Sequence, residues 1–133
     1  MKFTLTHYRK AGRTHEEFME WLVLVHLPKA IPIFQKHGIT GYALFDTPAT
    51  INDPFRQAIQ QVNPTWEVAD YDCFIEYTLP SVDTITNVMG DPEWIEAVSD
   101  QYDYVDVTKA LLSVGTHTQY LAGGNVLSPP TIL

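Results

Sequence analysis

The sequence feature that most constrains this chain is the stretch of residues 14–38, which carries a helix-start signal, an apolar stripe and a helix-stop signal. Thr14 and Glu17 have the spacing of a capping box, in which each side chain satisfies a backbone N–H near the helix start. Four apolar residues then follow at the spacing of one helical face: Phe18, Trp21, Leu22 and Val25. Gly38 stands where a left-handed residue commonly ends a helix. The stretch therefore predicts an amphipathic helix whose apolar face needs a partner surface.

His26 lies at the edge of this stripe and not on the side expected to face solvent, at about 100° per residue. Pro28 removes a backbone donor and crowds the preceding turn, so a bend or restart is expected directly after His26. Two interpretations follow. In the simpler one, His26 is a half-buried residue bonded to a backbone carbonyl. In the other, it is a chemical group held where the backbone is irregular.

Alternating patterns elsewhere predict four strands, at residues 2–9, 39–47, 68–79 and 113–121. A weaker helical period within residues 48–64, with a start at Asp53-Pro54, indicates a short surface helix or excursion. A second helical region follows residue 80, and within it Asp91 before Pro92 is a strong helix start.

The predicted order is therefore β-α-β-β-α-β, the α+β ferredoxin-like arrangement of four antiparallel strands with helices on one face. We expect residues 1–122 to form one domain and residues 123–133 to form a loose C-terminal tail. The sheet face without helices would stay exposed in a single copy, so a homodimer is expected.

Composition argues against several classes of function. The 133 residues carry a formal net charge of −8, and the basic residues form no long cluster, so no nucleic-acid partner is expected. No apolar run is long enough to cross a bilayer, so no membrane association is expected. The single cysteine, Cys73, cannot form an internal disulfide, which favours a reducing, cytoplasmic location. The histidine spacing matches no zinc motif, and no glycine-rich nucleotide loop is visible, so we expect neither a metal nor another cofactor.

Several motifs resemble the EthD-domain group of dimeric α+β barrel proteins. The resemblance covers nearly the whole chain, apart from residues 48–64 and the tail. It rests on Tyr8-Arg9-Lys10-Ala11-Gly12 with Glu16-Glu17-Phe18, on Trp21 with Val25-His26-Leu27-Pro28, on Asp70-Tyr71-Asp72-Cys73-Phe74-Ile75-Glu76-Tyr77, and on Asp91-Pro92-Glu93-Trp94. Within that group the combination is most similar to small fungal proteins of aromatic-polyketide pathways, including decarboxylases that act on anthrone-type carboxylic acids. Other members of this scaffold are cyclases, isomerases, dehydratases and oxygenases, so the fold does not determine the reaction.

The groups available for catalysis are those of acid–base chemistry. His7 shares a strand face with apolar residues, and the alternate neighbours of His117 are small or polar, so we expect both to point into a cavity between the sheet and the helices. The resemblance adds His26, at a position where the family's helix has a histidine followed closely by proline. Tyr42 is a possible hydrogen-bond donor to a substrate oxygen, although a packed core tyrosine is the alternative. These four residues form the predicted catalytic set.

The predicted substrate-binding residues are three aromatic side chains and two carboxylates: Trp21, Phe74, Trp94, Asp72 and Glu76. The aromatic planes could stack on a flat polycyclic ligand, and the alternative for each is a place in the core. The carboxylates either orient a histidine or are solvated strand residues. His15 and His37 are expected to be exposed, with His37 stabilising the C-terminus of its helix.

The resemblance implies a cofactor-independent lyase of secondary metabolism, with decarboxylation of an anthrone-type or related polyketide acid as the first expectation. Histidine and tyrosine donors would bind the substrate oxygens, CO₂ would leave, and an imidazolium, best His26 or His117, would protonate the remaining carbon. The same histidine acting as a base would drive dehydration, cyclisation or isomerisation. A cofactor-free oxygenase and a non-catalytic binding module for an aromatic metabolite are further alternatives.

Overall fold

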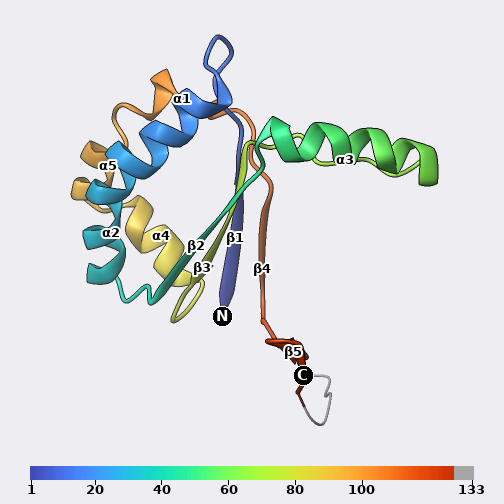
Figure 1. Cartoon of the computed structure of the whole chain (residues 1–133). Coiled ribbons are helices and arrows are strands. Elements are labelled where there is room, and N and C mark those ends of the chain that lie inside the picture. Colours follow the sequence, from blue (N-terminus) through green and yellow to red (C-terminus); the bar gives the residue numbers. More distant parts are fainter. Residues whose placement is uncertain (128–133) are drawn as a thin grey trace.

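Four antiparallel strands form the central sheet of the computed structural model, which describes residues 1–127 (Figure 1). In the order β2-β3-β1-β4, they are β2 (Gly41–Asp46), β3 (Cys73–Thr78), β1 (Lys2–His7) and β4 (Leu112–Gly115). This is the strand order of the split βαβ arrangement, so the predicted α+β ferredoxin-like fold is confirmed. Each of the four strands is shorter than its predicted range. Within residues 1–127, the chain lacks a helix with the length and apolar character that a membrane span requires.

Helices cover one face of the sheet, and the opposite face has no helix packed on it in the described part of the chain (Figure 1). The covering elements are α1 (His15–Glu20), the π-helical turn η1 (Trp21–His26), α2 (Leu27–Lys36), α4 (Asp83–Met89) and α5 (Pro92–Ala97). The start signals predicted at Thr14 and Asp91 are confirmed. Thr14 and Glu17 form a complete capping box at α1, and the Asp91 carboxylate accepts a hydrogen bond from the Glu93 N–H at the start of α5.

The buried face of the continuous helical run α1–η1–α2 advances in four-residue steps, at Phe18, Leu22, His26, Ala30 and Phe34. In a regular α-helix, at about 100° per residue, such a series would drift steadily around the axis. In η1 the turn is wider, and the Leu27 N–H bonds to the Leu22 carbonyl five residues back. The wider turn keeps the series on the side that faces the sheet.

This change of phase corrects two expectations for the first helix. Val25, predicted in the apolar stripe, is 45% exposed, and His26, predicted at its edge, is only 7% exposed. The bend expected after His26 is instead the junction of η1 with α2, where the backbone stays helical. Pro28 lacks an N–H and its ring crowds the turn before it, and a widened π-helical turn accommodates both effects.

α3 (Ala49–Val62) projects away from the sheet and has no buried residue (Figure 1). The predicted surface helix is confirmed, but it begins at Ala49 and not at Asp53-Pro54. The N–H groups of Ile51 and Asn52 both bond to the Pro48 carbonyl, which forms the first turn ahead of Pro54. The N–H that Pro54 lacks is tolerated because water can reach the backbone of an exposed helix.

The C-terminal region differs from its prediction. The strand expected at residues 113–121 is wrong beyond Gly115, where β4 ends. The chain then forms a hairpin of β5 (Leu121–Ala122) and β6 (Asn125–Val126), with Gly123 and Gly124 at positive φ of 57° and 79° in its turn. Residues 123–126 therefore form the turn and second strand of a hairpin and not a loose tail, and the Ser128-Pro129-Pro130 segment lies outside the described residues. The division at residue 122 stays a prediction.

Candidate active site

A cavity of about 370 Å³ lies between the helices and the sheet. Its walls are mostly apolar and come from β1, β3, η1, α2, α4, α5 and the segment of residues 101–112. The volume lies within the range of small-molecule sites, which are typically apolar with a few polar groups. Four of the predicted site residues line this cavity: His7, Trp21, His26 and Trp94.

His26 is held between two indole rings in the cavity wall. Its ring stacks on Trp21, with centroids 5.1 Å apart, and meets the edge of Trp94 at 5.7 Å. Its Nδ1 atom is buried and has no hydrogen-bond partner among the described residues, unlike the carbonyl-bonded histidine of the simpler interpretation. Burial lowers the pKa of His26 to about 4, although the Asp100 carboxylate acts in the opposite direction. The imidazole is therefore neutral at neutral pH and can accept a proton.

His7 lies at the end of β1, and the strand register puts it on the helix-covered face with Leu5 and Cys73. Its ring meets the edge of Phe18 at 6.1 Å. Burial lowers the pKa of His7 to about 4, and a charge on His26 would lower it further. The cavity therefore holds two imidazoles that are not easily protonated at the same time. Such a pair can exchange a single proton with a bound ligand.

The ring of Trp21 is fixed from two sides. Its Nε1–H donates to the Asp100 carboxylate over 3.0 Å, and its face stacks on Tyr104 with centroids 5.0 Å apart and planes only 6° apart. The Arg13 guanidinium lies 4.3 Å from the centroid of the Tyr104 ring. Asp100 therefore acts on His26 in two ways, because it positions the indole on which His26 stacks and adds a nearby negative charge.

Tyr42 does not line the cavity. Its ring stacks on Phe34 at 5.9 Å and meets the edge of Tyr77 at 5.1 Å, and its buried hydroxyl has no partner among the described residues. Burial, together with Tyr77 and Cys73, raises the pKa of Tyr42. Its surroundings fit the packed core tyrosine of the alternative interpretation.

Three predicted site residues lie on the bare side of the sheet. Phe74 and Glu76 pair in register with Thr6 and Thr4, opposite the face of His7. The expectation that His117 points into the cavity is wrong: it is exposed, and its Nδ1 lies 3.5 Å from Glu76 Oε1. Regular alternation cannot place His117, because β4 ends two residues before it.

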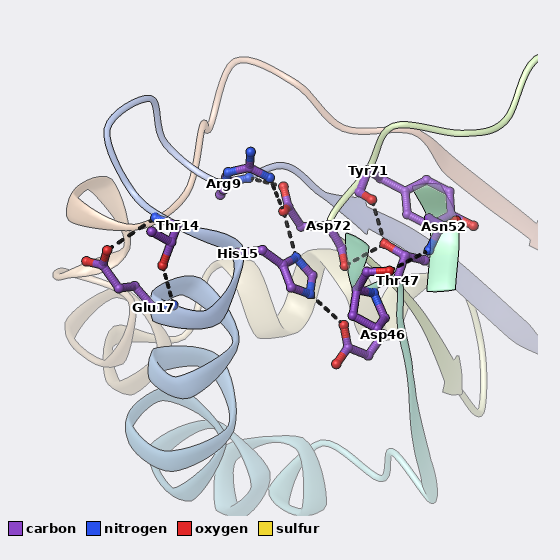
Figure 2. A network of polar contacts seen from close by, with 10 residues as sticks. Arg9, Thr14, His15, Glu17, Asp46, Thr47, Asn52, Tyr71 and Asp72 are labelled. Atoms are coloured by element: carbon purple, nitrogen blue, oxygen red, sulfur yellow. Dashed lines mark hydrogen bonds and ion pairs between the residues drawn. The ribbon is translucent and has the colours of Figure 1, made fainter. Parts of the chain in front are cut away.

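Asp72 belongs to a second polar cluster, at the end of the sheet near the start of α1 (Figure 2). It accepts hydrogen bonds from the backbone N–H and the guanidinium of Arg9, both at 2.7 Å. His15 joins two carboxylates, with Nδ1 2.9 Å from Asp72 Oδ1 and Nε2 2.7 Å from Asp46 Oδ1. Asp72 therefore does orient a histidine, as one interpretation proposed, but that histidine is His15.

The expected exposure of His15 and His37 is wrong, because both are partly buried and bonded to carboxylates. The side chain of His15 is 12% exposed, and burial alone would lower its pKa, but the bonds to Asp72 and Asp46 outweigh this effect and raise it. His37 Nε2 lies 2.7 Å from Asp91, the residue that caps α5. His37 thus joins the end of α2 to the start of α5.

Sequence reasoning missed Asp100, Gln101 and Lys109, which lie near or in the cavity wall. They lie outside regular strands and long helices, where periodicity carries no signal. The cluster of His15 with Asp46 and Asp72, here called the His15 clamp, could have been found in part from the sequence. Asp46 shares a strand face with apolar residues, so its side chain had to point towards the helices. Within residues 1–127, no three His, Cys, Asp or Glu side chains are placed to hold a metal ion.

Comparisons with known proteins find a matching family and several similar proteins. A family model described as the EthD domain matches residues 10–108. The chain is 32% identical over 130 residues to dehydratase iacD of Pestalotiopsis fici, an alignment that covers 98% of this chain and 94% of that protein. It is 23% identical to the conidial pigment biosynthesis dehydratase EthD of Metarhizium robertsii, over 93% of this chain and 87% of the relative. It is 25% identical to decarboxylase nsrE of Aspergillus novofumigatus, over 93% and 82%.

A solved structure supports the fold. The crystal structure of a protein from Arabidopsis thaliana superposes with a TM-score of 0.54 at 15% sequence identity, and the match covers 89% of this chain and 95% of that one. At this identity the similarity concerns only the path of the backbone.

Proposed function

The chain belongs to the EthD-domain family, as its motifs predicted, and on that premise we propose that it is a lyase that eliminates water from an aromatic polyketide, with His26 as the general base. Relatives that align over nearly the whole chain are named dehydratases and decarboxylases, which supports an enzyme over a binding module.

The observation that carries this proposal is the environment of His26. Its ring is buried in the cavity wall, its Nδ1 has no described partner, and burial lowers its pKa to about 4. An imidazole that is neutral at rest can take up a proton, whereas it would first have to be protonated in order to donate one at the start of a reaction. Dehydration begins with removal of a proton from a carbon next to a carbonyl. The relative at 32% identity is named a dehydratase.

In the proposed reaction the substrate ring system lies against Trp21 and Trp94. The His26 imidazole takes a proton from the carbon next to a carbonyl, and the C–H electron pair forms an enolate. The enolate then expels the hydroxyl group from the neighbouring carbon, and the His26 imidazolium returns the proton, so that water leaves. A new C=C bond forms, no oxidant or reductant is consumed, and a ring that becomes aromatic makes the step favourable.

His7 has a supporting role in this scheme. It shares the cavity with His26, and its pKa is lowered to a similar value of about 4. When His26 holds the proton, a neutral His7 can bind the carbonyl oxygen through its N–H and stabilise the enolate. General acid–base assistance of this kind is worth about 10²–10⁴-fold in rate.

Decarboxylation is the second candidate, and the apolar cavity wall favours it. A carboxylate in a poorly solvated cavity is destabilised relative to the neutral CO₂ that leaves, and several relatives are named decarboxylases. The carbanion would then need a proton from a histidine. Since burial lowers the pKa of both cavity histidines, the imidazolium expected from the sequence is not the resting form.

The test is incubation of the purified protein with a panel of hydroxylated polyketide ketones and polyketide carboxylic acids. Product masses, CO₂ release and dioxygen consumption are followed for the wild-type protein, His26→Gln and the surface variant His117→Gln. Loss of water that depends on His26 and not on His117 is the expected result.

Each other outcome has a distinct meaning. CO₂ release that depends on His26 would replace dehydration with the second candidate. Dioxygen consumption would indicate an oxygenase, and a product of unchanged mass a cyclase or isomerase. Full turnover by folded His26→Gln would remove the general base from the mechanism. Ligand binding without any product would point to a binding module.

We also propose that the protein is a homodimer that buries the bare face of the sheet. Phe45 is 58% exposed on that face and pairs in register with Phe74. Pairing two copies would remove both rings from water, which is worth roughly 25 cal/mol per Å² of apolar area. Light scattering at micromolar concentration tests this, and a Phe45→Lys variant should dissociate. A wild-type monomer would contradict the proposal.

A further inference from the structure

The cavity wall contains one positively charged side chain among its described residues, Lys109, and no carboxylate. The two histidines of the wall are neutral at neutral pH because burial lowers their pKa values. Gln101 and Tyr77, two further polar side chains of the wall, are uncharged, since burial raises the pKa of the Tyr77 hydroxyl. Lys109 is therefore the one formally charged side chain among the described residues of the wall, and its charge attracts anions.

Two hydrogen bonds, one before Lys109 and one after it, attach its segment to β1 and to the residue that follows β1. The Asp106 N–H bonds to the Tyr8 carbonyl over 2.8 Å, and the Leu111 N–H bonds to Thr6 Oγ1 over 2.8 Å. Lys109 thus lies in a short segment that is hydrogen-bonded at both of its ends, Asp106 and Leu111. Its position at the cavity is set by the sheet and not by a free loop.

Among the described residues, the Lys109 ammonium forms no ion pair with a carboxylate. It lies 5.7 Å from the centroid of the Tyr8 ring. Hydrogen bonds from Thr108 and, less strongly, the charge of Lys109 lower the pKa of Asp106, so the lysine interacts with that carboxylate only electrostatically. The neighbouring Asp106 carboxylate is occupied by the hydroxyl and the N–H of Thr108. In a chain of net charge −8, a lysine without a bonded carboxylate at an aromatic cavity is a distinctive feature.

From this geometry we infer that Lys109 binds a carboxylate of the substrate at the cavity mouth. Lys109 is exposed, whereas His26 is buried, so the two groups contact different parts of one ligand. The inferred substrate is an aromatic carboxylic acid whose rings lie against Trp21 and Trp94. The inference rests on the proposed function for its choice of an aromatic polyketide. It adds that the carboxylate anchors the molecule and is retained when water leaves.

The experiment measures binding without turnover, so that it is independent of the proposed reaction. Anthraquinone-2-carboxylate and anthraquinone-2-carboxamide have the same ring system and differ in charge. Their dissociation constants are measured by quenching of tryptophan fluorescence, since Trp21 and Trp94 line the cavity. We expect the wild-type protein to bind the carboxylate about tenfold more tightly, a modest value for an exposed ion pair, and added salt to reduce the difference.

The variants identify the lysine. Lys109→Gln should remove the preference for the carboxylate and leave the affinity for the carboxamide unchanged, whereas Lys109→Arg should retain the preference. Lys10→Gln makes the same charge change at an exposed residue outside the cavity wall and should behave as the wild type. Equal affinity of the wild-type protein for both probes, absence of binding, or a preference that survives in Lys109→Gln would overturn the inference. A preference that depends on Lys109, in a protein that eliminates no water, would overturn only the proposed reaction.

Discussion

Two histidine environments within one domain shift the pKa of the imidazole in opposite directions. His26 packs against Trp21 in an apolar cavity wall, where burial lowers its pKa to about 4. His15 lies at the end of the sheet between Asp46 and Asp72, where two hydrogen-bonded carboxylates outweigh the effect of burial and raise its pKa (Figure 2). The same side chain is therefore held neutral in one place, and its protonated form is favoured in the other.

The difference lies in which ring nitrogens are free. Both nitrogens of His15 are bonded to carboxylates, so the ring connects α1 to the end of β2 and to Asp72, the residue before β3. His26 has a nitrogen without a described partner and lines a cavity large enough for a small molecule. We therefore expect variants of His26 to change catalysis and variants of His15 to change stability.

Removal of the cavity base has the largest expected effect. His26→Gln keeps a polar side chain of similar length but cannot take up a proton at neutral pH, so kcat should fall by about 10²–10⁴-fold. The measurement uses whichever panel substrate the wild-type protein converts. His15→Gln, assayed where it is folded, should keep kcat within a few-fold of wild type. Equal losses in the two variants would show that His26 and His15 do not have different roles.

Removal of His15, which bonds to Asp46 and Asp72, has the next largest expected effect, and this effect is on stability. His15→Ala leaves Asp72 bonded to Arg9 but deletes both carboxylate contacts of the imidazole. Because Asp46 is partly exposed, we expect the free energy of unfolding to decrease by about 1–3 kcal/mol. Chemical denaturation measures the change, and Glu16→Ala in the same helical turn is the control. A His15→Ala variant as stable as the wild type would remove the structural role of the cluster.

The two environments should also respond to pH with opposite signs. His15 has a raised pKa when folded, so its stabilisation is complete below its unfolded pKa and is lost as pH rises through the raised value. His7 and His26 have lowered pKa values, so stability falls as pH drops from 6.5 towards 4, by up to about 1.4 kcal/mol per pH unit for each group.

Denaturation series across pH separate these contributions. The stability difference between wild type and His15→Ala should shrink as pH rises. The double variant His7→Gln/His26→Gln should lose stability less steeply in acid. Parallel curves for all three proteins would show that neither shift is linked to folding.

His117 should have the smallest effect. It is exposed and lies 3.5 Å from a partly exposed carboxylate, a contact of the kind that contributes about 0–1 kcal/mol. His117→Ala should therefore change the free energy of unfolding by less than about 0.5 kcal/mol and leave kcat within twofold. A large loss of activity would mean that His117 contacts substrate in another arrangement, such as a dimer.

Much of the fold could be predicted because its signals are local. The capping box at Thr14 and the N-cap at Asp91 involve atoms within three residues of each other, and both formed as expected. The alternation of strand residues also identified all four strands of the sheet. The strand prediction is wrong after Gly115, because pairing with β1 ends there and alternation no longer places side chains on a sheet face.

Sequence patterns alone predicted the ferredoxin-like order of elements. Of the nine residues they nominated for the site, four line the cavity: His7, Trp21, His26 and Trp94. Tertiary structure decided the rest. The π-helical turn η1 rotated His26 into the wall and Val25 out of it. Strand register decided that Asp46 and Asp72, distant in sequence, both meet His15, and a connection anchored to β1 brought Lys109 to the cavity. This division follows from the distance along the chain over which each signal acts. Capping hydrogen bonds and periodicity involve residues a few positions apart, whereas the pKa of a histidine depends on the groups that the folded sheet and helices bring beside it.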